Sequence, residues 1–172
     1  MRPNGTVSVS KITKADGSDL PLSEAVSLGI ITPKGYQEYD GEVVIGENLF
    51  LDQGRQAMAY CMGFKAPISN YVVAAFGVGT GTTSPSSTDT SLEAPVAFSS
   101  GLYTQPIDGV DFLTPFVMRV SYTIGLNDCN GYALTERGLF TGAGILIARQ
   151  VTAVPLVKTS DIALSLVWRV RF

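Results

Sequence analysis

Residues 162–172, which decide the fold, read Ile162-Ala163-Leu164-Ser165-Leu166-Val167-Trp168-Arg169-Val170-Arg171-Phe172. Every second residue from Ile162 to Phe172 is apolar, and successive side chains of a strand point to opposite faces of a sheet. The spacing therefore predicts a strand whose apolar face points into a core. A chain end frays unless a sheet holds it, so we expect this strand to be paired. Arg169 and Arg171 lie on its other face, which we expect to be solvated.

Further segments upstream have strand patterns. Residues 116–124 alternate apolar and polar side chains. Residues 132–140 and 145–151 have the pattern of paired strands joined by a Gly-rich turn, and residues 42–50 and 71–76 are short apolar runs. Several short strands separated by Gly, Asn and Asp predict a mainly β chain, folded as an antiparallel β-sandwich or barrel-like domain.

One short helix is expected at about residues 52–62. Asp52 is of a type favoured at the N-cap position, and Gly63 is suited to end the helix. Met58, Cys61 and Met62 share one face at helical spacing. We expect this face to pack in the core, which is the ordinary place for such residues.

Residues 1–40 differ from the rest of the chain. Their glycines and prolines leave one short strand pattern, at Val7 and Val9, and one helical turn that would end at Gly29. We therefore predict an extended N-terminal arm over residues 1–40, followed by a β-sandwich domain over residues 41–172. The arm's apolar residues are candidates for contact with a partner: Val7, Val9, Ile12, Leu20, Leu22, Tyr36 and Tyr39.

The composition favours a chain that buries much of its outside against partners. Hydrophobic residues make up 45% of the chain and charged residues 16%, whereas ordinary domains carry about 25% charged residues. The net charge is −3 and the cations are scattered, so no nucleic-acid partner is expected. We expect neither a signal peptide nor a membrane span. Cys61 and Cys129 do not make a disulfide framework, so we expect free thiols and synthesis in the cytoplasm.

The sequence argues against an enzyme. It has no His, which removes Ser–His and Cys–His nucleophile pairs and most zinc sites. No lysine follows the glycines of residues 77–81, so these are expected to permit a turn or bulge rather than to cradle a phosphate. A small glycan hydrolase would have to bring Asp89, Asp108 and Asp111 together, and turn formation is their ordinary use. No catalytic residue, cofactor or metal site is assigned, and a cation bound at residues 108–111 stays open.

Four segments occur in an order that carries a family resemblance. They are Asn48-Leu49-Phe50-Leu51-Asp52-Gln53-Gly54, residues 76–92 (FGVGTGTTSPSSTDTSL), Leu134-Thr135-Glu136-Arg137-Gly138-Leu139-Phe140, and Val157-Lys158-Thr159-Ser160-Asp161 running into the final strand. In this order they are similar to a widespread set of virion proteins of tailed bacteriophages. In that set a helix precedes a loop of this composition, and a strand containing a tryptophan follows. The similarity covers residues 42–172 and leaves out the first 40.

The resemblance implies a structural protein of the virion and carries no catalytic residue. Its first implication is a capsid decoration, or cement, protein on the head surface, bound to the shell of the major capsid protein. Such a protein would be a homo-oligomer, with a trimer favoured. In this hypothesis residues 1–40 clip neighbouring capsid subunits, and their deletion leaves a folded domain. The alternative is a tail, baseplate or fibre component that uses the same β-domain.

Overall fold

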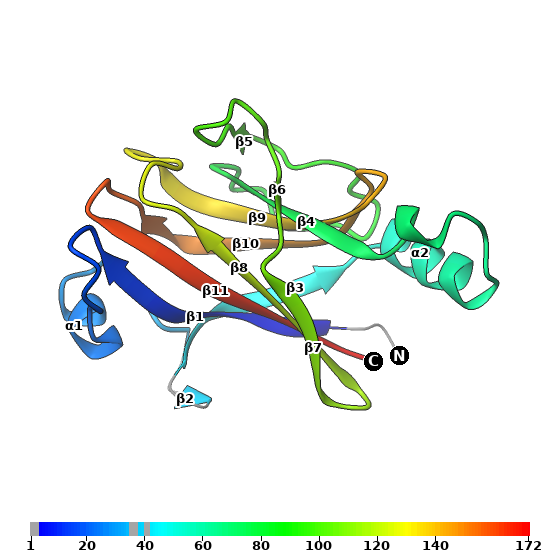
Figure 1. The fold of residues 1–172 in the computed structure, drawn as a ribbon, viewed down its shortest axis with the longest axis horizontal. Helices are drawn as coiled ribbons and strands as arrows, with labels where there is room; N and C mark the ends of the chain where they lie inside the picture. The colour runs from blue at the N-terminus through cyan, green and yellow to red at the C-terminus, as the bar shows by residue number, and fades with distance from the viewer. Residues whose placement is uncertain (1–3, 35–37, 40–41) are drawn as a thin grey trace.

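The computed structural model describes residues 4–34, 38–39 and 42–172 (Figure 1). These residues are mainly β, as predicted, with eleven strands and two α-helices. The strands are β1 (Asn4–Lys14), β2 (Glu38–Tyr39), β3 (Glu42–Phe50), β4 (Val73–Gly79), β5 (Pro95–Val96), β6 (Gln105–Pro106), β7 (Gly109–Thr114), β8 (Val117–Ile124), β9 (Ala133–Thr141), β10 (Leu146–Val157) and β11 (Ile162–Arg171). The helices are α1 (Leu22–Ser27) and α2 (Asp52–Met62), and a single 3-10 turn spans Ile68–Asn70.

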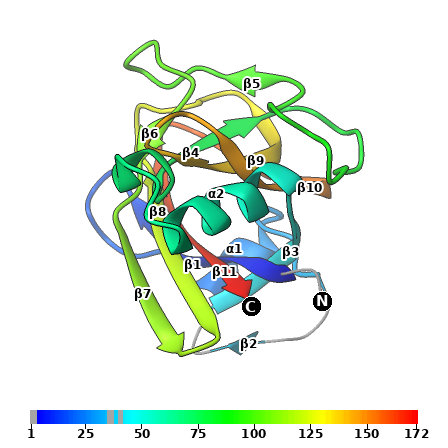
Figure 2. The same ribbon diagram turned by 90° about the vertical axis from the view of Figure 1, so that its right-hand side faces the viewer.

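The strands form one antiparallel sheet that curls on itself. Its neighbours run β5-β4-β9-β10-β3-β1-β11-β8-β7, with β2 beside β3 and β6 beside β4. The segment after β6 joins the two halves, because the Ile107 N–H donates to Ala74 O at 3.2 Å and the Asp108 N–H donates to Ser121 O at 2.8 Å. The sheet thereby encloses a core as a barrel-like domain, and α2 lies across one of its ends (Figure 2).

Strand β11 confirms the pattern of residues 162–172. It lies between β1 and β8, and its alternate residues from Ile162 to Val170 are buried. Trp168 is fully buried. Phe172 is the exception, since it lies beyond the paired residues and is exposed.

The prediction that the face of β11 with Arg169 and Arg171 is solvated is wrong at Arg169. Its side chain is buried and pairs with Glu42 at 2.6 Å, and it also donates to the Ser8 hydroxyl at 3.2 Å. The Asn48 amide donates to the Arg169 carbonyl at 3.1 Å. Partners from β1 and β3 therefore cover this face, and only Arg171 remains exposed as predicted.

Helix α2 lies where the sequence placed it, with two differences. Asp52 is its first residue rather than its N-cap, which is Leu51, and the Asp52 N–H donates to Ser87 O at 2.9 Å. The helix ends at Gly63, as predicted. Its methionine face is core only in part, since Met58 is half-buried against the core and Cys61 is half-buried, whereas Met62 is 79% exposed. The helix buries Gly54 and Ala57 instead, because it covers only part of the barrel end.

The prediction of an N-terminal arm is wrong for the described residues before position 35. Strand β1 pairs with β11 over Asn4–Lys14 and with β3 over Asn4–Val9, so it lies inside the sheet. After it, Leu20 is buried, and α1 packs Ala25 into the same core. The folded domain therefore begins at β1 rather than at residue 41.

Four of the seven candidate contact residues of the arm are buried in the domain and are therefore unavailable to a partner. Val7, Val9 and Ile12 are fully buried. Leu20 is buried as well, and Leu22 is half-buried against the core. The two remaining candidates are not placed: Tyr36 lies outside the described residues, and for Tyr39 only the backbone, in β2, is described.

Candidate functional site

A buried ion cluster holds the Ser/Thr-rich loop that follows β4. Glu136 of β9 is fully buried and accepts the backbone N–H groups of Glu93 at 2.7 Å and Ala94 at 3.1 Å. It also accepts from Arg149 of β10, at 2.7 Å to Nε. The opposite edge of the Arg149 guanidinium reaches Asp89 of the loop at 2.7 Å. We call Asp89, Glu93, Glu136 and Arg149 the Arg149 cluster.

The same loop is fixed at further points along its length. Glu93 accepts the N–H and the hydroxyl of Thr83, at 2.9 and 2.8 Å, and these hydrogen bonds lower the pKa of the Glu93 carboxyl. Asp89 accepts the Ser86 N–H at 2.9 Å, and the Ser87 hydroxyl donates to Asp52 of α2 at 3.3 Å. The loop is thus bonded to itself, to α2 and to the sheet.

The glycines before this loop make room for the cluster. A Cβ atom at Gly79 or at Gly81 would lie 2.6 Å from Oε2 of Glu136. No real side chain tolerates that approach, so glycine is required by packing at both positions. These glycines therefore serve a close approach of strand and carboxylate, in place of the turn or bulge that the sequence suggested.

A second buried cation, Lys158, holds two turns together. Its ammonium group donates to Thr159 O at 2.6 Å, to the Asn130 side chain at 2.8 Å and to Leu126 O at 3.2 Å. Burial lowers the pKa of Lys158, and its three acceptors occupy the three N–H donors. All of its donors are therefore used in holding the two turns together.

Beside Lys158, the turn of residues 125–131 folds inward. Burial alone would raise the pKa of Asp128, but the N–H and hydroxyl of Ser99 and the N–H of Gly125 donate to its carboxylate and hold the pKa below its ordinary value. Cys129 is buried, and burial raises its pKa to about 11. We call Asp128, Asn130 and Lys158 the Lys158 cluster.

The three aspartates that a glycan hydrolase would need are engaged separately. Asp89 belongs to the Arg149 cluster, Asp108 accepts the Thr123 hydroxyl at 2.8 Å, and Asp111 faces Arg119 at 3.7 Å. Their partners lie on β10 and β8, so the structure does not bring the three carboxylates to one cleft. Within the described residues, no three His, Cys, Asp or Glu side chains gather as a metal site requires.

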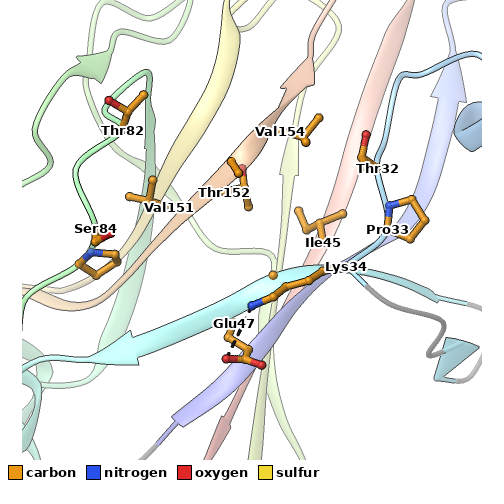
Figure 3. A pocket seen from close by; sticks show the side chains of 13 residues that line it. Thr32, Pro33, Lys34, Ile45, Glu47, Thr82, Ser84, Val151, Thr152 and Val154 are labelled. Atoms are coloured by element: carbon orange, nitrogen blue, oxygen red, sulfur yellow. Dashed lines mark ion pairs between the residues drawn. The ribbon is translucent and has the colours of Figure 1, made fainter.

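A recess of about 490 Å³ opens where β3 and β10 separate (Figure 3). These strands pair only at Phe50–Ala148 and Leu49–Arg149, and beyond these pairs both line the recess. Thr82, Ser84 and Pro85 of the Ser/Thr-rich loop close one side, and Lys34 pairs with Glu47 at 3.8 Å near the opposite side. Both ions are largely exposed, so the recess presents a mixed polar and apolar surface.

An apolar groove of about 470 Å³ lies at the end of the barrel that α2 covers. Its lining includes residues of α2 and of the β7–β8 hairpin together with Phe172. Figure 2 shows α2 and this hairpin at the same end of the ribbon. No charged residue is among its described lining residues. We use the term apolar end for this groove together with the exposed residues next to its walls: Phe64, Leu113 and Phe116.

Comparisons of the chain with models of known protein families, with curated proteins and with solved structures find no match. No helix in the part of the chain that the structure describes is long and apolar enough to span a membrane.

The sequence patterns did not single out the residues that hold the loop. Glu136 and Arg137 are adjacent charges in the middle of an apolar strand, and that position was the available signal. Two such residues point to opposite faces of a sheet. Accordingly, Glu136 meets Arg149, while Arg137 is fully buried and donates to Gln150 at 3.0 Å and to Leu134 O at 3.1 Å.

Proposed function

We propose that the chain is a non-enzymatic structural protein of a tailed-bacteriophage virion, which decorates and stabilises the capsid by binding the major capsid protein shell. One observation carries the proposal. Three of the four segments that resemble virion proteins meet in space, because the Ser87 hydroxyl donates to Asp52 and residues 76–79 of β4 pair with residues 136–139 of β9. The shared residues of these segments thus hold a fold together, which is the role expected of residues that a structural family has in common.

The position of β1 changes how such a protein would bind. Because residues 4–14 are part of the sheet, the shell would be contacted by the outside of the folded domain rather than by a free arm. The recess between β3 and β10 is the surface that suits this contact. Two strand edges diverge there, and a strand edge can accept an extended segment from another protein. Many copies, associated as trimers, would then bind by avidity.

Antibody labelling of particles of the phage that encodes the chain tests the proposed place. Label over the head surface is expected. Label confined to the tail tip would overturn decoration and favour the alternative of a tail, baseplate or fibre component. Intact particles without any label would show that the chain is not a component of the virion.

A charge placed in the recess tests the proposed contact. Val154 lines the recess and is 49% exposed, so Val154→Arg should lower the occupancy of the chain on heads without unfolding it. Val157→Arg is the matched control, since Val157 lies on the same strand with 43% exposure and is not among the residues lining the recess. Equal occupancy for the two variants would argue against binding through the recess.

A further inference from the structure

The apolar end has the composition of an interface core on the surface of a single chain. Met62 and Phe112 line its groove and are 79% and 65% exposed, and Phe116 at the hairpin tip is 68% exposed. Isolated exposed apolar residues are normal, whereas a contiguous set with no charge among its lining marks a surface that another molecule covers.

The exposed apolar area reaches the size that a stable interface needs. Phe64, Phe112 and Phe116 alone present roughly 400 Å² of aromatic surface, judged from their exposed fractions and ~200 Å² for a whole aromatic side chain. A stable interface buries about 800 Å² on each partner. Met62, Leu113 and Phe172 add most of the remainder, because each is more than two-fifths exposed.

The edge of the sheet at this end is also left open. Strand β7 ends the path of the sheet and, among the described residues, pairs only with β8. Edge strands in monomeric proteins are usually protected by lysine, proline or inward-pointing charge. Strand β7 instead exposes Val110, Phe112 and Leu113, and its one charge, Asp111, is matched by Arg119 of its own hairpin.

Charge selects the partner that fits this surface. Where two copies meet about a two-fold axis, the same surface of each copy faces the other, so any uncompensated charge near the axis would meet its like. The chain is acidic, with a net charge of −3, yet the carboxylate nearest the groove on β7 is neutralised within its own hairpin. No charged residue is among the described lining of the groove, and the ammonium group of Lys65, next to Phe64, lies over the Tyr60 ring at 3.8 Å. We infer that the apolar end is the surface through which copies of this chain associate with one another.

This association does not depend on a role in a virion. The groove would receive an apolar residue of a neighbouring copy, for which Phe64 and Phe116 are suitably exposed, while the edge of β7 supplies unpaired backbone groups. The hairpin and α2 would then be covered in the assembly.

Sedimentation equilibrium of the purified full chain tests the inference. The wild-type chain should be a dimer or a higher closed oligomer that dissociates on dilution. Phe112→Ser should raise the dissociation constant by at least about tenfold, because a large aromatic anchor is lost from the centre of the interface. Leu28→Ser is the matched control, since Leu28 is 62% exposed at α1, away from the apolar end, and this variant should associate as the wild type does.

Thiol labelling places the contact independently. Cys61 lines the groove, whereas Cys129 is buried. A maleimide should therefore react with Cys61 more slowly in the oligomer than in the dissociated Phe112→Ser protein, with circular dichroism showing both to be folded. A monomeric wild-type chain overturns the inference. So does an oligomer that is indifferent to Phe112→Ser, or one in which Cys61 reacts at the monomer's rate.

Discussion

The Arg149 cluster has a buried ion pair at its centre, whereas at the apolar end large hydrophobic side chains face solvent. Arg149 is 3% exposed and Glu136 fully buried, yet Met62 and Phe64 are each 79% exposed. This distribution reverses the usual one, in which arginine and glutamate are on the surface and methionine and phenylalanine are inside. The two regions therefore serve different purposes, and their energetics should differ accordingly.

Which side chains are buried therefore depends on what each region holds together. Buried ions cost desolvation energy, and they persist where hydrogen bonds satisfy them from several directions. The Arg149 cluster meets that condition because its carboxylates accept from both backbone and side chains of the loop. It fixes a polar loop that cannot bury enough apolar surface to fix itself. The apolar end contributes little to the fold of one chain and is suited to contact between chains.

The largest effect is expected when the sheet that carries both regions is opened. Deleting residues 1–14 removes β1 from between β3 and β11 and exposes the apolar residues that pack against Val7, Val9 and Ile12. Burying one such side chain stabilises a domain by about 1.5–3 kcal/mol, and whole domains are stable by only about 5–15 kcal/mol. We expect the truncated chain to lose its cooperative thermal transition and its near-ultraviolet circular dichroism.

The control for this deletion is Lys11→Ala, on an exposed side chain of the same strand. It should keep the wild-type transition within about 0.5 kcal/mol. A truncated chain that still unfolds cooperatively would restore the idea of a detachable arm.

The next largest effect compares two arginines on neighbouring strands. Arg149→Met leaves Glu136 buried without its cation, and breaking a buried ion pair costs about 3–5 kcal/mol. Arg137→Met removes a buried cation that has no ion pair among the described residues, and whose pKa burial lowers to about 10. We expect it to cost less, because relief from desolvation offsets the loss of its two hydrogen bonds.

Urea denaturation of both variants at neutral pH gives the comparison. A smaller loss of unfolding free energy for Arg149→Met than for Arg137→Met would contradict the assignment of the Arg149 cluster as the loop's anchor.

The period of the sequence predicted which residues share a face but not where the core ends. Residues 116–124 have one apolar face, yet Phe116 is exposed, Met118 is half-buried and Val120 is fully buried. The hairpin extends beyond the core, and no local pattern reports that. Strand β11 and helix α2 were predictable because their alternation and end signals are local.

Contacts between distant segments were not predictable in the same way. Strand β1 pairs Val7 with Trp168, across nearly the whole chain, and its own alternation is too short to distinguish an interior strand from an arm. The Arg149 cluster joins residues 13 and 60 positions apart. A single charged residue in a strand pattern indicates a face, and only the register of the sheet shows what that face meets.

Lowering the pH should affect the two kinds of region differently, because the lining of the apolar groove has no carboxylate whereas the polar regions do. Hydrogen bonds hold the pKa of Asp128 below its unfolded value, so its carboxylate binds fewer protons in the folded state. The contribution is therefore present above the ordinary aspartate pKa and is lost as the pH falls through the lower, folded pKa.

Thermal unfolding from neutral pH to below pH ~4 should show this loss in the wild type and a shallower dependence in Asp128→Asn. Asp161→Asn is the control, since Asp161 is solvent-exposed and, among the described residues, its carboxylate accepts only from the Ser160 hydroxyl. An equally steep acid loss in wild type and Asp128→Asn would show that Asp128 does not link protons to folding.

The smallest effect is expected at the apolar end itself. Phe64→Ser should change the unfolding free energy of the dilute, monomeric chain by no more than about 0.5 kcal/mol, because the ring is 79% exposed and buries little surface in one copy. At concentrations where copies associate, the melting temperature of Phe64→Ser should fall below that of the wild type, because association stabilises only the folded chain and the variant associates less. A loss that is equal at both concentrations would mean that Phe64 packs within its own fold. A loss of stability that appears only at high protein concentration would show that Phe64 acts in contacts between chains. The buried ions of the Arg149 cluster, in contrast, act within one chain.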